Sequence, residues 1–225
     1  MKLNALKTFT LWLSLLSVIM AEEPQPDYEL TYEVFSLPLA AAADLRRENL
    51  GGVKMHARLI GMLENKNASQ ETFLLCHLSE KQDGRASTTE EFIYPTEPEP
   101  DHFMGPKTPP AQYIAPLFAL PRVAQAYDSK NLGETVEASI SKSEKGLLLR
   151  IQAKHVSLLG LDAFGTGVSR APFPRFGVQK ITASSQVALG RPFLIGTVSP
   201  KIAKAQKPGE RQIWLAWATV TLSKK

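Results

Sequence analysis

The clearest structural signal in this chain of 225 residues lies at residues 136–154, which read VEASISKSEKGLLLRIQAK. Apolar and polar residues alternate on both sides of the segment SEKG at residues 143–146. Alternation with a period of two residues is typical of a strand with one buried and one exposed face. Because Ser and Gly are favoured in turns, the sequence predicts two antiparallel strands joined by a tight turn.

Further strands are predicted toward the C-terminus. Residues 175–189 alternate in the same way, with Leu189 on the apolar side, and Gly190 opens a turn into a strand at residues 193–198. Residues 213–220 are apolar on both faces, which is typical of a central strand. The glycines and prolines of residues 160–174 predict a loop.

The N-terminal part mixes strands and helices. Residues 28–37 alternate like a half-buried strand, whereas residues 39–47 and 53–64 have the apolar spacing of helices. Residues 69–79 and 85–94 are predicted as two strands, and the Asp-Gly pair between them is a hairpin signal. This part is therefore predicted to be a strand, two helices and a hairpin.

Residues 1–21 have the layout of a signal peptide, with a positively charged start, a short apolar run and the small residue Ala21 at the expected cleavage position. The apolar run is shorter than the roughly 20 residues that span a membrane as a helix. The sequence therefore predicts an exported protein, and an uncleaved N-terminal anchor is the alternative.

The predicted fold class is α+β and rich in strands. An N-terminal unit at residues 22–94 is followed by a proline-rich linker at residues 95–125 and an antiparallel β region at residues 126–225. A unit of this size with few strands would be marginally stable by itself. We therefore expect the two structured regions to share one core.

The composition excludes several classes of protein. Lys and Arg number 26, Asp and Glu number 22, and no basic run indicates a nucleic-acid partner. Cys76 is the one cysteine, so an internal disulfide is excluded. Its apolar surroundings in sequence predict a small buried side chain.

We find no pattern that predicts catalysis, a cofactor or a metal site. Neither a G-x-S-x-G nor a Walker A motif occurs, and residues 165–167, GTG, are predicted as a turn. The acidic residues between Glu90 and Asp101 do not match a calcium loop and are predicted to be solvated. No metal-binding spacing connects the four histidines, His56, His77, His102 and His155. The chain is therefore predicted not to be an enzyme.

Four segments resemble motifs of the secretins, the outer-membrane channels of bacterial type II and type III secretion and of pilus systems. Residues 127–133, YDSKNLG, are similar to F-E-x-R-N-x-G, and residues 175–184, RFGVQKITAS, to P-x-F-x-x-R-x-x-T-T-S. Residues 187–196, VALGRPFLIG, are similar to V-x-D-G-x-x-x-x-x-G, and residues 92–100, FIYPTEPEP, to a strand-exit motif of secretin-like proteins. The motif positions in this chain are Tyr127, Asn131, Gly133, Phe176, Thr182, Gly190 and Gly196.

The resemblance implies a short relative of the secretin core domain that acts in protein secretion or envelope assembly without catalysis. It implies a location in the periplasm or outer membrane and strand-mediated association, with a homo-oligomer or envelope and secretion proteins as partners and membrane association left open. The charge pattern, as noted above, indicates no nucleic acid as a partner. The chain departs from the family pattern at Leu189, where an Asp is expected, and at residues 199–210, which replace a longer closing motif. A periplasmic binding module for an unknown ligand is the alternative function, and a hydrolase with an unrecognised site ranks last.

Overall fold

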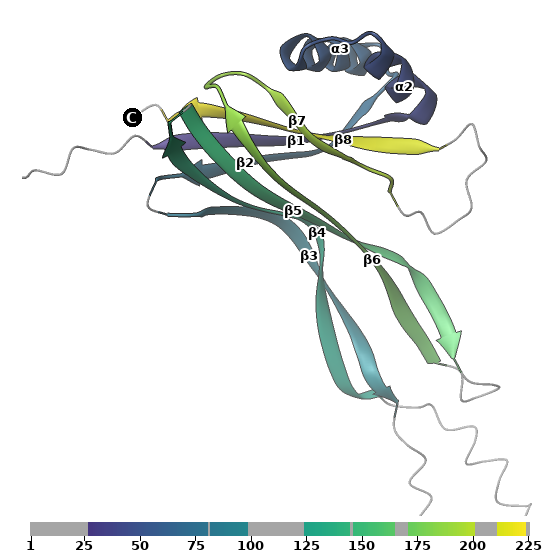
Figure 1. The fold of residues 1–225 in the computed structure, drawn as a ribbon. Helices are drawn as coiled ribbons and strands as arrows, with labels where there is room; N and C mark the ends of the chain where they lie inside the picture. Colours follow the sequence, from purple (N-terminus) through teal and green to yellow (C-terminus); the bar gives the residue numbers. More distant parts are fainter. Residues whose placement is uncertain are drawn as a thin grey trace, which may run out of the picture.

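The computed structural model describes residues 27–80, 82–98, 124–144, 146–164, 171–200 and 211–223. In these ranges the strands form two antiparallel sheets stacked in two layers, and two helices lie on the outer face of one sheet (Figure 1). The predicted fold class, β-rich α+β, is confirmed.

The sheet under the helices, called the short sheet here, has the order β2-β1-β8-β7. Its strands are β1 (Tyr28–Pro38), β2 (Ser69–Leu78), β7 (Phe193–Val198) and β8 (Gln212–Leu222). The predicted central position of β8 is confirmed, since it pairs with β1 on one side and β7 on the other. Its apolar faces are both buried: Trp217 packs in the cluster beneath the helices, and Ala216 and Val220 in the cluster between the sheets.

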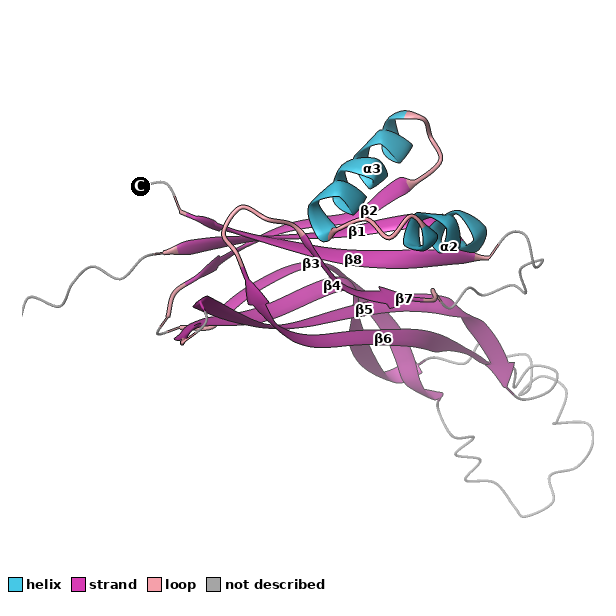
Figure 2. Cartoon of the chain, turned by 45° about the horizontal axis from the view of Figure 1, so that its top comes forward, coloured by secondary structure: helices cyan, strands magenta, loops and turns pink. Residues whose placement is uncertain are grey.

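The helices α2 (Leu39–Arg47) and α3 (Gly52–Glu64) confirm the two predicted helical segments. They lie together on one side of the short sheet (Figure 2). Leu45 of α2 and Leu59 of α3 are buried in one cluster with Phe35 and Trp217 of the sheet. Neither helix in the described part of the chain is long and apolar enough to cross a membrane.

The second sheet, called the long sheet here, has the order β3-β4-β5-β6. Its strands are β3 (Gly84–Pro98), β4 (Ala124–Ser143), β5 (Gly146–Phe164) and β6 (Ala171–Val187). The predicted turn between β4 and β5 is confirmed by the pairing of Ser143 with Gly146.

The long sheet divides at one level, called the branch point here. Pairing between β4 and β5 extends from the turn to Gly133 and Val156 and no further. Beyond it, β3 stays paired with β4, and β5 with β6, so two separate two-stranded arms project away from the short sheet (Figure 1).

The main core lies between the two sheets. Alternate residues of β4 and β5 face it, as predicted, and are buried against β1, β2 and β8. Among them are Val136, Ile140, Leu149 and Ile151. Residues before and after the proline-rich segment thus contribute to one core. This confirms the expectation that the two structured regions share a core. The division into the predicted units at 22–94, 95–125 and 126–225 stays a prediction.

The predicted hairpin between residues 69–79 and 85–94 is wrong. The two strands exist, but β2 pairs with β1 and β3 pairs with β4, so they belong to different sheets. At the crossing, a Cβ on Gly84 would lie 2.3 Å from the carbonyl oxygen of His77 and 2.6 Å from Cys76 Sγ. Glycine therefore lets the chain fold back tightly while it changes sheets, and a turn signal does not distinguish this crossing from a hairpin.

The predicted loop at residues 160–174 is also largely wrong, because β5 continues to Phe164 and β6 begins at Ala171. Gly160 lies at a register shift with a φ of 153°, a conformation that glycine permits. Pro172 and Pro174 are tolerated because β6 is an edge strand. At the other end β6 stops at Val187, so Leu189 lies in the following turn and is exposed rather than inward-facing.

Candidate functional site

The long sheet has two free edges among the described residues, β3 and β6, each of which pairs with a strand on one side. A free edge presents unpaired backbone N–H and C=O groups that can pair with another strand. Because all neighbouring strands of this sheet are antiparallel, β3 and β6 also run antiparallel to each other. The two edges are therefore complementary in direction.

The edges also differ in charge. Exposed acids, Glu90 and Glu91, lie on β3, whereas exposed bases, Arg175 and Lys180, lie on β6. Arg175 is 3.6 Å from Asp162 of the neighbouring strand, so its charge is partly compensated within the chain. Opposite charges on the two edges favour pairing of β3 with β6 over pairing of like edges.

An aromatic cluster lies just beyond the branch point and joins the two arms. Phe92 and Tyr94 of β3 have ring centroids 6.2 and 5.5 Å from that of Phe176 of β6. The Tyr94 hydroxyl also donates a hydrogen bond to Asp128 Oδ2 at 3.2 Å. Aromatic pairs at these separations attract each other, so the cluster stabilises the arms near the point where they separate.

A buried polar network occupies the core side of the branch point. The Tyr32 hydroxyl donates a hydrogen bond to Glu134 Oε1 at 3.0 Å, and His155 Nδ1 lies 2.8 Å from Glu134 Oε2. Glu134 is 4% exposed and stands directly opposite His155, in the pair next to the end of β4–β5 pairing. Burial, together with the neighbouring Glu134, raises the pKa of the Tyr32 phenol above its usual value.

This network connects the sheets rather than forming a substrate site. Tyr32 comes from the short sheet, Glu134 and His155 come from the long sheet, and the His155 ring meets Trp214 edge-on at 4.7 Å. The cavity that these residues line has a volume of about 10 Å³. That volume is comparable to the space one water molecule needs, so it leaves no room for a substrate.

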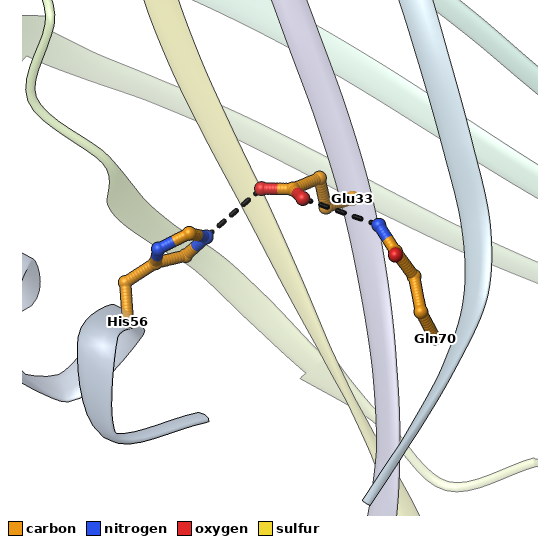
Figure 3. A network of polar contacts seen from close by, with 3 residues as sticks. All are labelled: Glu33, His56 and Gln70. Carbon is orange, nitrogen blue, oxygen red and sulfur yellow. Dashed lines mark hydrogen bonds and ion pairs between the residues drawn. The ribbon is translucent and has the colours of Figure 1, made fainter. Parts of the chain in front are cut away.

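A second network fastens α3 to the outer face of the short sheet (Figure 3). His56 Nε2 lies 2.9 Å from Glu33 Oε2, and Gln70 Nε2 donates a hydrogen bond to Glu33 Oε1 at 3.1 Å. The His56 ring also packs edge-on against Phe35 and Trp217. The network fixes where the helix lies on the sheet.

The structure distributes the motif positions along three strands and a turn instead of gathering them in one pocket. Tyr127, Asn131 and Gly133 lie on β4, Phe176 and Thr182 on β6, Gly190 in the turn after β6, and Gly196 on β7. Ala21 and the rest of the predicted signal peptide lie outside the described residues, as do His102, Glu99, Asp101 and residues 165–167.

Two of the motif glycines adopt a backbone conformation that other residues rarely adopt. Gly133 lies within β4 with a φ of 118°, and a Cβ there would be 2.2 Å from the Thr88 carbonyl oxygen. Gly190 has a φ of 70°, and its N–H donates to the Val220 carbonyl oxygen at 2.7 Å. Both positions therefore favour glycine over other residues.

Neither polar network was predicted from the sequence, although one signal was present. Glu134 is in phase with Val136 and Ile140 on the apolar face of its strand, and His155 is in phase with Ile151. A charged or polar residue on an apolar face predicts a buried partner. The strand register that pairs Glu134 with His155 was needed to identify that partner. Among the described residues, no group of three or more His, Cys, Asp or Glu side chains is arranged to hold a metal ion.

Comparisons with known proteins give matches of fold. No family model matches the sequence. No curated protein matches it either.

Among solved structures, the type IV competence pilus secretin PilQ of V. cholerae matches with a TM-score of 0.50 and 8% identity, over 97% of this chain and 66% of that one. The secretin InvG of the Salmonella type III secretion injectisome matches with a TM-score of 0.47 and 10% identity, over 98% of this chain and 70% of that one. The type II secretin GspD of enteropathogenic Escherichia coli matches with a TM-score of 0.47 and 9% identity, over 96% of this chain and 75% of that one. The fold of the described chain therefore resembles that of a secretin domain.

Proposed function

We propose that this chain is an exported, non-enzymatic envelope protein whose copies associate through strands, in protein secretion or in envelope assembly. The observation that carries the proposal is the pair of free edges on the long sheet, which are antiparallel to each other and opposite in charge. The resemblance in fold to a pilus secretin supports the same class of function.

The contact between copies is head to tail: β3 of one copy pairs with β6 of the next. Since the long sheet has four strands, the alternation of strand direction continues across this contact from copy to copy. A head-to-tail contact makes a ring if the rotation closes and a filament if it does not. In a closed ring no edge strand of the long sheet is left unpaired, which accounts for the exposed edges of these long strands in the single chain.

The test is the particle mass of the full chain after expression with its N-terminal segment. The envelope is fractionated, the protein is extracted in mild detergent, and the mass of the particle is measured by light scattering. The proposal predicts a discrete oligomer in the periplasmic or outer-membrane fraction. A strictly monomeric protein that co-purifies with no envelope protein would contradict it.

A periplasmic binding module is a second candidate, because an apolar pocket of about 310 Å³ lies between α2 and the strands β7 and β8. Its lining includes Ala42, Met55, Leu194 and Leu215. Pockets of a few hundred Å³ with mostly apolar walls commonly bind small molecules. A ligand found by thermal-shift screening should lose its effect in Ala42→Leu, which fills the pocket; an unchanged shift in that variant would exclude this pocket.

A further inference from the structure

Prolines are placed on both free edges of the long sheet, and always in the arms. Pro95 lies on β3, opposite Tyr127 of β4. Pro172 and Pro174 lie on β6, opposite Ala163 and Leu161 of β5. Each is beyond the branch point, at which β4 and β5 stop pairing.

The direction in which these residues point follows from the chemistry of proline. Proline has no backbone N–H, so within a paired strand it fits only where its nitrogen faces away from the neighbouring strand. Pro172 and Pro174 are two positions apart, so both nitrogens face the same side of β6, the free edge. In this part of β6 the free edge therefore lacks two successive hydrogen-bond donors.

The alternation of N–H directions along β6 also identifies the part of its free edge that has hydrogen-bond donors. β6 pairs with β5 without a register shift from Gly177 to Val187. Thr182 and Ser184 are an even number of positions from Pro172 and Pro174, so their backbone nitrogens also face the free edge. Unlike the prolines, both residues have an N–H group that can donate a hydrogen bond. The edge of β3 has the same arrangement, with no proline from Gly84 to Tyr94 and Pro95 directly after.

We propose that the contact between copies is confined to Gly84–Tyr94 of β3 and Phe176–Val187 of β6, and that the prolines close the outer parts of the arms, which begin at Pro95 on β3 and end at Arg175 on β6, to strand pairing. This rests on the proposed function, because it describes how a second copy of this chain is bound. The confined segment retains the charge difference between Glu91 and Lys180. It leaves the outer parts of the arms, beyond Tyr94 on β3 and Phe176 on β6, free of strand contacts between copies, so the part of the molecule farthest from the short sheet does not extend the contact.

The experiment compares proline variants on one edge by their dissociation constants, measured by light scattering over a dilution series. In Thr182→Pro a donor is removed from the segment that forms the contact, while the pairing of β6 with β5 is retained; Thr182→Val is the matched control. Ser184→Pro repeats the test at a second position of the same parity, and circular dichroism checks that each variant is folded. In Pro172→Thr with Pro174→Thr, two donors are added to the arm.

We expect Thr182→Pro and Ser184→Pro to weaken association at least about tenfold, and Thr182→Val to associate like the unchanged chain. The double replacement at residues 172 and 174 should tighten association about tenfold or more, because two further hydrogen bonds form. If it leaves the dissociation constant unchanged while Thr182→Pro weakens it, the proline boundary is wrong and the proposed function stands. If neither Thr182→Pro nor Ser184→Pro has an effect, β6 is not the contact, and both proposals fail.

Discussion

The polar network at the branch point makes a quantitative prediction about stability. In Tyr32→Phe the hydroxyl that donates to Glu134 Oε1 at 3.0 Å is removed, and the rest of the ring stays in place. Tyr32 is 1% exposed and Glu134 4%, so the donor is removed from a buried carboxyl group. A hydrogen bond to a charged group contributes about 1.5–3 kcal/mol, and we expect the free energy of unfolding to fall by that amount.

Tyr28→Phe is the matched control, because Tyr28 is on the same strand and faces the same core. Its hydroxyl donates to Glu80 at 3.2 Å, but Lys142 also pairs with Glu80, at 2.9 Å, near the surface. Losing this hydroxyl should therefore cost less than about 1 kcal/mol. The two residues differ in their partners and not in the substitution.

Urea unfolding followed by circular dichroism is the assay. With a typical urea dependence for a small protein, a loss of about 2 kcal/mol lowers the midpoint by about 1 M. The midpoint of Tyr28→Phe should stay close to that of the unchanged chain. Equal midpoints for the two variants would refute the reasoning, because they would mean that Glu134 does not depend on the buried hydroxyl.

Gly133, Tyr32 and Cys76 each give a further testable prediction. Gly133→Ala should lower the free energy of unfolding, measured by thermal unfolding, by about 3 kcal/mol or more, because a Cβ would lie 2.2 Å from the Thr88 carbonyl oxygen at a φ of 118°. Gly61→Ala in α3 is the control: its Cβ would meet nothing within 4 Å, so it should stabilise the folded chain slightly. Burial raises the pKa of the Tyr32 phenol above its value in the unfolded chain, which is about 10. The neutral phenol therefore contributes to the stability of the folded chain below about pH 10, and this contribution is lost as the pH rises toward the folded pKa. Alkaline unfolding with the same pH dependence in Tyr32→Phe would contradict this. Burial also raises the pKa of the Cys76 thiol, so a thiol reagent at neutral pH should modify Cys76 slowly in the folded chain and rapidly in urea; equal rates would mean that Cys76 is accessible.

Local patterns predicted the elements well, because burial of one face leaves a period in the sequence. The alternation in β4 and β5, the two helices and the central β8 were all predictable in this way. It was not predictable that β2 and β3 belong to different sheets, because strand pairing depends on residues far away in the chain. The turn at Gly84 is compatible both with a hairpin and with a crossing between sheets.

Proline and charge were the signals that sequence reasoning misinterpreted or passed over. Pro172 and Pro174 predicted a loop, although an edge strand accommodates proline equally well. Glu134 and His155 were each in phase with buried neighbours, but only the register shows that they stand opposite each other. The motif positions indicated the right type of fold without indicating a pocket, because they lie on separate strands and a turn, and two of them, Gly133 and Gly190, have a backbone conformation that favours glycine.

Cross-linking between copies tests the central claim most directly. In a background in which Cys76 is replaced by Ala, Thr89→Cys on β3 is mixed in turn with Val178→Cys, Lys180→Cys and Thr182→Cys on β6, and each variant is also oxidised alone. Thr89, Val178, Lys180 and Thr182 are all exposed, so each introduced thiol is accessible. Head-to-tail pairing predicts a covalent dimer in at least one mixture and none with either variant alone. Dimers from the single variants, or no dimer in any mixture, would contradict association of β3 with β6.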